Sequence, residues 1–160
     1  MTASDNEADQ SPLLRRPRRA PRLSAVDLRH RGRALALMAL YEADTAGHPP
    51  EEVVGRLAED ERVPRDTVAF ASALVAGVRD GRDDLDERIE RAAPQFPIEQ
   101  LSAVDRNIIR IALYELLRER ETPIAVVMSE AVELAHVFGS DGSPRFVNGV
   151  LGGLGSVRDG

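Results

Sequence analysis

The chain has 160 residues, a formal net charge of −6 and no cysteine, which excludes disulfide bonds, cysteine-type zinc fingers and thiol catalysis. Its length allows one domain of modest size, and with only 4% aromatic residues a core must consist of leucine, valine, isoleucine and alanine. No apolar run approaches the roughly 20 residues that span a bilayer, and the polar start lacks the pattern of a secretion signal. We therefore expect a cytoplasmic protein with no membrane segment.

Charge is divided unevenly along the chain. Residues 1–33 hold eight arginines against four acids, a balance of +4, whereas residues 34–160 hold 13 arginines against 23 acids, a balance of −10. A basic head can hold phosphates, but an acidic body repels a polyanion unless it is turned away from it. The two parts are therefore expected to have separate tasks.

The first 23 residues are polar, with three prolines among five arginines. Such a segment cannot bury enough apolar surface to order itself, so we expect a disordered basic arm over residues 1–23. Its arginines could extend an anion-binding surface or form a solubilising tail, and the sequence leaves both open. Residues 24–157 are expected to form a single all-helical domain.

Helical periodicity begins at Ser24, where Asp27 completes a variant of the capping box. This helix runs to about residue 46 and ends at Gly47. Shorter helices are predicted from about residue 50 to 61 and from about 65 to 79. The charged segment 85–93 continues the last of these or forms its own helix, and the acids around it are expected to be a solvated face.

The second half has the clearest helical pattern. A cap formed by Ser102 and Asp105 starts a helix to about residue 118, and its apolar residues, Ile111 among them, cover more than half its circumference. It should therefore be central and largely buried. Thr122 and Pro123 start the next helix, with Leu134 in the core.

The end of the chain is expected to be helical and then loose. Phe138 is placed in the core just before Gly139 ends its helix, and a last helix begins at residues 143–144. The four glycines after it are interpreted as helix termination and a loose tail: Gly149, Gly152, Gly153 and Gly155. The pattern as a whole predicts an all-α bundle of about seven helices with no sheet.

Sites for catalysis, metals or cofactors are not predicted. The three histidines are scattered, and no set of His, Asp and Glu has metal-ligand spacing. The glycine-rich end follows no strand, so it does not match a phosphate-binding loop. We expect a binding protein, not an enzyme, without metal or cofactor.

A basic helix start is the best candidate site. Arg29, His30 and Arg33 share one side of the first turns. Arginine offers phosphate a bidentate fork and offers a base a flat face, and a helix N-terminus adds amide donors, although Asp27 opposes an anion there. On these residues alone, an RNA-binding surface and an ordinary solvated face are equally good interpretations.

Several motifs resemble the NusB family of bacterial transcription antitermination factors. They are RHRGRALALMALY from residue 29, LSAVDRNIIRIALYELL from 101, PIAVVMSEAVELAHVFG from 123 and RFVNGVL from 145. The resemblance spans roughly residues 25–155. It implies a compact all-α fold of two packed halves.

The resemblance also implies function and partners. Members of this family pair with a small-subunit ribosomal protein, called NusE in its transcriptional role, and bind single-stranded boxA RNA of ribosomal RNA leaders. With other Nus factors they keep RNA polymerase elongating. Some members self-associate through the partner-binding surface, so a homodimer is an alternative. Others occur fused to a ribosomal RNA methyltransferase, so an accessory role in ribosomal RNA modification is another alternative.

Site residues carry over from the motifs as implications of the resemblance. The RNA-binding set is Arg29, His30, Arg31, Arg33 and Phe146. The set for the ribosomal protein is Tyr41, Asp105 and Arg106. The sequence departs from the family pattern where a histidine replaces a frequent arginine at position 30, and where Gly142 and Pro144 precede the RF pair.

Overall fold

The computed structural model describes residues 24–158, and the expected basic arm lies outside them. The described residues form seven α-helices and two short 3-10 helices, with no strand, which confirms the all-α prediction. The α-helices are α1 (Ala25–Ala46), α2 (Pro50–Asp60), α3 (Arg65–Asp80), α4 (Arg82–Ala92), α5 (Ala103–Arg118), α6 (Ile124–Phe138) and α7 (Ser143–Leu154). The 3-10 helices are η2 (Ile98–Gln100) and η3 (Gly155–Arg158).

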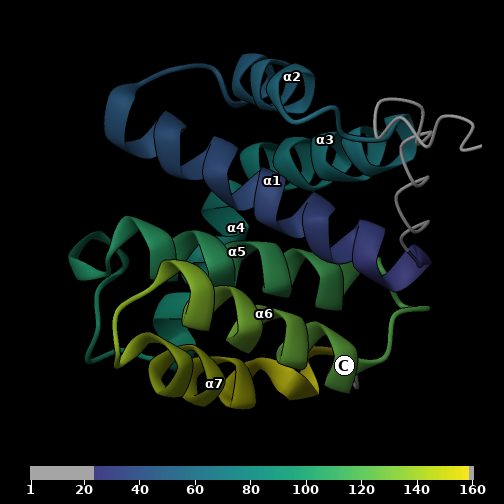
Figure 1. Cartoon of the computed structure of the whole chain (residues 1–160). Coiled ribbons are helices and arrows are strands. Elements are labelled where there is room, and N and C mark those ends of the chain that lie inside the picture. The colour runs from purple at the N-terminus through teal and green to yellow at the C-terminus, as the bar shows by residue number, and fades with distance from the viewer. Residues whose placement is uncertain (1–23, 159–160) are drawn as a thin grey trace, which may run out of the picture.

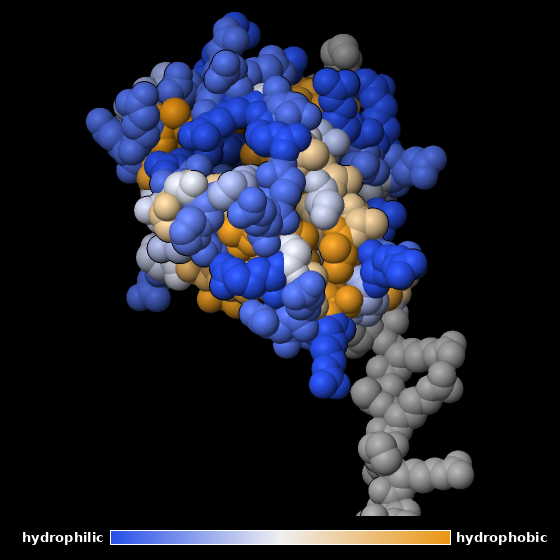
Figure 2. All heavy atoms as spheres, turned by 90° about the horizontal axis from the view of Figure 1, so that it is seen from above, coloured by the Kyte–Doolittle hydropathy of each residue, from blue (hydrophilic) through white to orange (hydrophobic). Residues whose placement is uncertain are grey.

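The helices are arranged in two layers (Figure 1). The first layer holds α1, α2 and α3, and the second holds α4 to α7. α5 is central, because it packs against α1 and α3 across the layers and against α4, α6 and α7 within its own. Seen from above, the surface is mostly hydrophilic with small apolar patches (Figure 2), so most apolar side chains are turned inward.

Side-chain caps fix where α1 and α5 begin. The Ser24 hydroxyl accepts from the Asp27 amide, and the Asp27 carboxylate accepts from the Ser24 amide, which makes a complete capping box. At α5 the Ser102 hydroxyl accepts from the Asp105 amide, and no bond returns from the Asp105 side chain. Pro123 occupies the N-cap position of α6 and makes no side-chain cap there, whereas Thr122 was expected as the N-cap and Pro123 as the first helical residue.

The core agrees with the predicted faces, with two corrections at helix ends. Ile111 and Leu134 are 2% and 1% exposed, as predicted. Phe138 was expected in the core and is 36% exposed, because it is the last residue of α6 and lies beyond the packed turns. The glycines were expected to end the last helix, but α7 continues through Gly149 to Leu154.

A buried ion pair joins the two layers. Arg33 on α1 and Glu115 on α5 have side chains only 3% and 1% exposed. The Arg33 guanidinium donates to both carboxylate oxygens, over 2.8 to 3.1 Å. Both charges are enclosed, and the Glu115 carboxylate depends on Arg33 for compensation, whereas Arg33 also has Glu130 on α6 at 3.5 Å.

A second buried arginine ties three helices together. Arg110 on α5 donates through two nitrogens to Asp86 on α4, at 2.7 and 2.9 Å, and through a third to Asp44 on α1, at 3.2 Å. Asp86 was expected on a solvated acidic face, but its side chain is only 20% exposed. The sequence could not separate it from its exposed neighbours, because its partner lies 24 residues away.

The last described residue closes the C-terminal end of α5. Arg158 donates to the carbonyls of Leu116 and Glu119, at 2.8 and 2.9 Å, and to that of Thr122 at 2.6 Å. The final carbonyls of a helix lack partners within the helix and carry partial negative charge. One arginine therefore caps α5 and holds η3 against it.

We predict that Arg33→Met destabilises the protein by about 3–5 kcal/mol, because it leaves the Glu115 carboxylate buried without a counter-charge. Arg33→Met with Glu115→Leu should recover most of that loss, since apolar pairs replace buried ion pairs at little cost. Urea denaturation of the three proteins measures this. A loss below about 1 kcal/mol in the single variant would contradict a buried pair.

Candidate functional site

The start of α1 presents two arginines to solvent. Arg29 is exposed, and its guanidinium lies 5.2 Å from the centre of the Phe70 ring on α3. The Arg31 side chain is 36% exposed, with Glu61 4.0 Å away. Neither is held by a close ion pair within residues 24–158, so both guanidinium groups remain available to an anion.

Arg33 does not belong to this exposed set, which corrects the expectation from the sequence. Its side chain is 3% exposed and bound to Glu115, with Glu130 on α6 3.5 Å away. A guanidinium that is already paired inside the protein cannot also take a phosphate from solvent. Helical periodicity places Arg33 on the same side of α1 as Arg29. One turn further along the helix, however, this side packs against the second layer.

His30 is intermediate in exposure between the exposed Arg29 and the buried Arg33. Its Nδ1 atom is 2.6 Å from a carboxylate oxygen of Glu130, and its side chain is 34% exposed. No hydrogen bond to Nε2 is formed within residues 24–158. The carboxylate beside it weakens its attraction for an anion, so His30 lies at the edge of the basic surface and contributes less than the arginines.

Phe70 orients the exposed arginine. Its ring lies under Arg29 and also 5.4 Å from Arg33, in the range where a cation is attracted to an aromatic face. The ring approaches the helix closely because residue 32 is glycine: a Cβ atom there would lie 2.5 Å from Phe70 Cδ1. This role of Phe70 was not predicted, because no local pattern in the sequence pairs residues of α1 with residues of α3.

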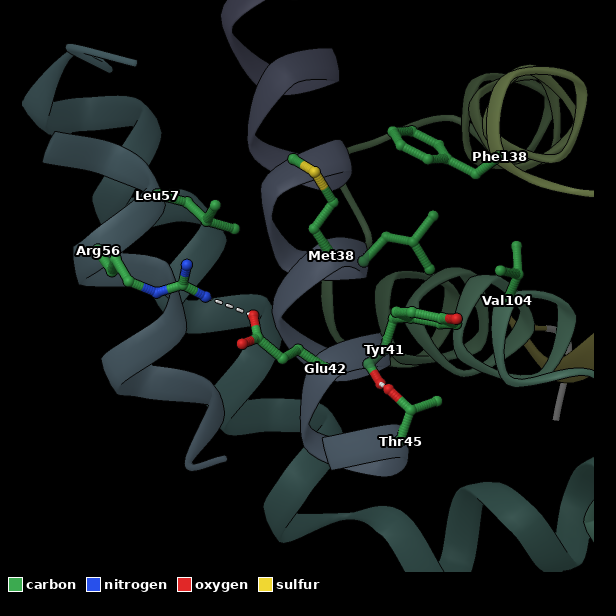
Figure 3. Close-up of a pocket in the computed structure, with 9 residues that line it drawn as sticks. Met38, Tyr41, Glu42, Thr45, Arg56, Leu57, Val104 and Phe138 are labelled. Atoms are coloured by element: carbon green, nitrogen blue, oxygen red, sulfur yellow. Dashed lines mark hydrogen bonds and ion pairs between the residues drawn. The ribbon is translucent and has the colours of Figure 1, made fainter. Parts of the chain in front are cut away.

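An apolar groove lies toward the other end of α1 (Figure 3). It has a volume of about 510 Å³, and it takes side chains from both layers. Tyr41 is 44% exposed and faces Val104 on α5 and Phe138 on α6. The lining residues are Leu37, Met38, Tyr41, Glu42, Thr45, Arg56, Leu57, Val104 and Phe138.

Polar contacts fix one wall of this groove. Glu42 on α1 forms an ion pair with Arg56 on α2, 2.6 Å apart, and lies 2.8 Å from His48. The His48 hydrogen bond is the main reason that the pKa of Glu42 lies below its ordinary value, and the charge of Arg56 adds to it. The carboxylate is thus charged and held in place, and the exposed apolar side chains form the rest of the surface.

Asp105 follows Val104 in the first turn of α5, but it is not among the residues that line the groove. Its Oδ1 atom is shielded from solvent and has no hydrogen-bond partner within the described residues. Leaving a shielded carboxylate oxygen unpaired is costly. The missing return bond to Ser102 means that capping alone does not account for this side chain.

Arg106 is engaged inside the protein. Its Nε donates to Asp44 at 3.0 Å, and its Nη1 donates to the Leu101 carbonyl at 3.4 Å. Burial alone would raise the pKa of Asp44, but hydrogen bonds from Asn107 and Arg106 and the charge of Arg110 outweigh it and lower the pKa. Only 20% of the Arg106 side chain is exposed, so a partner could contact only a small part of it.

Phe146 lies apart from both groups, on α7. It is half-buried, and its ring meets Phe96 edge to face at 5.2 Å. The structure therefore places Tyr41 in the groove, with Asp105 one residue beyond the lining residue Val104, and it brings Arg29, His30 and Arg31 to one helix start. It does not bring Phe146 to either.

Residues 24–158 contain no group of three His, Cys, Asp or Glu side chains that could hold a metal ion. In the same part of the chain, no helix has the length and apolar character needed to cross a membrane. The described surface instead has exposed arginines, which can bind an anion, and an apolar groove, which can bind a protein.

Comparison with known proteins identifies the family. The model of the NusB family matches residues 30–155. The chain belongs to the NusB family. The match includes α1 from His30 onward and extends through α7, so it covers the groove and the part of the basic start that follows Arg29.

Relatives and solved structures agree with this assignment. A transcription antitermination protein NusB of Roseiflexus castenholzii is 50% identical over 129 residues, 79% of this chain and 91% of its own. That of Dehalococcoides mccartyi is 44% identical, over 77% and 86%. The T. maritima NusB structure superposes with a TM-score of 0.75 at 31% identity, over 80% of this chain and 90% of its own. A crystal structure of the antitermination factors NusB and NusE in complex with double-stranded RNA gives 0.75 at 26% identity, over 82% and 98%.

The network around Asp44 predicts a dependence of stability on pH. A carboxyl whose pKa is lowered by folding stabilises the protein above its unfolded pKa of about 3.9, and that contribution is lost as the pH falls through the folded value. Asp44→Asn should therefore be less stable than wild type at about pH 6, and the gap should narrow towards about pH 3. Urea midpoints across this range measure the gap, and a constant gap would contradict the role assigned to the Asp44 charge.

Proposed function

We propose that this chain is a transcription antitermination factor, not an enzyme, that acts in the cytoplasm by binding boxA-type RNA of ribosomal RNA leaders together with the ribosomal protein NusE. Supporting this are the antitermination function named for the relatives and the structural similarity to NusB in a complex with NusE and RNA. The observation that carries the proposal is that α1 has a basic start at one end and an apolar groove at the other.

RNA is proposed to bind at the start of α1. Arg29 and Arg31 supply two guanidinium forks, and the helix N-terminus adds partial positive charge. The Phe70 ring lies beneath the Arg29 guanidinium and holds it in place. This lowers the conformational entropy that Arg29 loses when it binds a phosphate. His30 has no hydrogen bond at Nε2 within residues 24–158 and is proposed to offer that atom to a hydrogen-bonding group of the RNA. Arg33 is proposed to act only by anchoring this end of α1 to α5.

NusE is proposed to bind in the groove around Tyr41. The exposed rings of Tyr41 and Phe138 offer apolar area from both layers, and aromatic residues are frequent anchors of interfaces. Asp105, which follows Val104 in the first turn of α5, is proposed to add negative charge near the groove. Ribosomal proteins are typically basic, so an acidic body attracts one electrostatically. A second copy of the chain would compete for the same groove, and sedimentation of the protein alone tests for that homodimer.

Arg29→Ala with Arg31→Ala should weaken binding to boxA RNA and lower its dependence on salt. If each arginine neutralises one phosphate, the slope of log affinity against log salt should fall by about one unit, at about 0.7 per phosphate for a single strand. Fluorescence anisotropy over a salt series, with NusE present, measures the slope.

The matched control for this pair is Arg79→Ala with Arg82→Ala, which removes the same charge near the far end of α1, where Arg82 lies 3.8 Å from Asp44. Its salt slope should stay close to that of wild type. An unchanged slope in the Arg29 and Arg31 variant would remove the start of α1 from the RNA surface.

Asp105→Arg should lower affinity for NusE by tenfold or more, about 1.4 kcal/mol, because it replaces a negative charge near the proposed interface with a positive one that repels a basic partner. Asp105→Asn keeps most of the hydrogen-bonding capacity and should have a smaller effect. Loss of an acid in the first turn costs up to about 1 kcal/mol of stability, so Tm should move only slightly. Isothermal titration with NusE decides the point: equal affinity of wild type and Asp105→Arg would leave Asp105 only its place in the helix cap.

A further inference from the structure

A small pocket lies between the start of α1 and the start of α3. Its volume is about 230 Å³, which is below the usual range for drug-sized ligands and suits a single chemical group. We call it the α1–α3 pocket. It combines apolar walls with one cation, one acid and one hydroxyl group, and the residues that line it are Ala25, Leu28, Arg29, Asp66, Thr67 and Phe70.

Thr67 has a hydroxyl group that the described chain leaves without a partner. The residue is 2% exposed, and its Oγ1 atom is shielded from solvent and makes no hydrogen bond within residues 24–158. A buried hydroxyl without a partner costs free energy, whereas valine has the same shape and no polar atom to satisfy. Packing would therefore favour valine at this position, and the folded chain alone does not account for the hydroxyl.

The first turn of α3 has open hydrogen-bond donors. Pro64 occupies the N-cap position and makes no side-chain cap. The backbone bonds of the helix begin with the Val68 amide, which donates to the Pro64 carbonyl at 3.1 Å. Within the described part of the chain, the amides of residues 65–67 make no hydrogen bond. Free amides at the start of a helix carry partial positive charge and bind anions.

Arg29 brings a full positive charge to the same pocket from α1. Its side chain is exposed, and its guanidinium lies 5.2 Å from the centre of the Phe70 ring. An exposed contact of this kind is weak, so the guanidinium can leave the ring for an anion. Asp66 opposes an anion here, but it is exposed, and solvent screens its charge.

We propose that the α1–α3 pocket binds a phosphate group, whose oxygens accept hydrogen bonds from the open amides of α3, the Thr67 hydroxyl and the Arg29 guanidinium. A phosphate group has enough acceptor oxygens to take all three kinds of donor at once. Because the Thr67 hydroxyl is shielded in the unliganded chain, Arg29 turns from the Phe70 ring to the anion as the phosphate enters. An RNA backbone and a small phosphorylated molecule both carry this group, and the site does not require the proposed function.

Thr67→Val and Thr67→Ser test the hydroxyl. Thr67→Val should melt at a higher temperature than wild type, because an unpaired buried hydroxyl is gone, yet it should bind phosphate about tenfold more weakly. Thr67→Ser keeps the hydroxyl and should bind phosphate as wild type does, although loss of the methyl group lowers its stability. NMR titration with inorganic phosphate at constant ionic strength, following the amide signals of residues 65–67, measures the affinity.

Asp66→Asn and Asp83→Asn make a matched pair for the charge. Each removes one exposed acid from the first turn of a helix, α3 and α4 respectively, so each should lower the stability slightly. Only residue 66 lines the pocket. Asp66→Asn should bind inorganic phosphate about threefold more tightly than wild type, and Asp83→Asn should bind it as wild type does.

A second titration, with single-stranded boxA RNA in the presence of NusE, identifies the source of the phosphate. If the site holds the RNA backbone, Thr67→Val weakens RNA binding as well. If it holds a small phosphorylated molecule, Thr67→Val binds the RNA as wild type does, while inorganic phosphate still shifts the amide signals of residues 65–67 in wild type.

The titration with inorganic phosphate decides whether the site exists. Wild-type amides that do not respond to phosphate overturn the proposal, and so does equal phosphate affinity of wild type and Thr67→Val. A Thr67→Val variant that is less stable than wild type also overturns it, because the hydroxyl then has a structural partner. Failure of wild type to bind boxA RNA with NusE would overturn the proposed function and leave this result unaffected.

Discussion

The buried ion pair between Arg33 and Glu115 is the constraint on which the rest of the structure depends. It fixes α1 against α5, and α5 carries the contacts of the whole second layer. Ion pairs of this kind add little net stability compared with apolar side chains, but they penalise any arrangement that leaves one charge unpaired. Arg110 imposes the same condition through Asp44 and Asp86. A rotation or shift of α5 relative to α1 would break both sets at once, so the relative position of the two layers is narrowly defined.

That fixed position is what allows a groove to be shared between layers. Tyr41 belongs to α1, whereas Val104 and Phe138 belong to α5 and α6. A protein seated there would contact both layers and would stabilise the folded state by mass action. The anchoring of α1 serves the basic start in the same way, because the buried Arg33 holds the turn next to the one that exposes Arg29.

The sequence predicted the helices and most of the core, because both follow from local patterns. Ser24 and Ser102 mark helix starts by their own chemistry, and the apolar stripe of α5 needs no knowledge of its neighbours. Two errors arose at helix ends, where Phe138 lies beyond the packed turns of α6 and α7 runs on through its glycines. The others arose where a partner distant in the sequence decides the outcome. Arg33 resembles any exposed arginine until Glu115, 82 residues later, is placed beside it. The contact of Arg29 with Phe70 and that of Phe96 with Phe146 could not be predicted from the sequence either. Each joins two segments that only the fold brings together.

The uninterrupted helix α1 joins the basic start to the groove, and this has a consequence for how the segment can vary. Tyr41 lies ten positions after Arg31 in one helix, about 15 Å along its axis at 1.5 Å per residue. Inserting one residue between them would lengthen the spacing only slightly but would turn one end by about 100° relative to the other. RNA and protein bound at the two ends would then face different directions. Substitutions in this stretch can be accommodated one at a time, whereas a change in its length would disrupt the alignment of both surfaces.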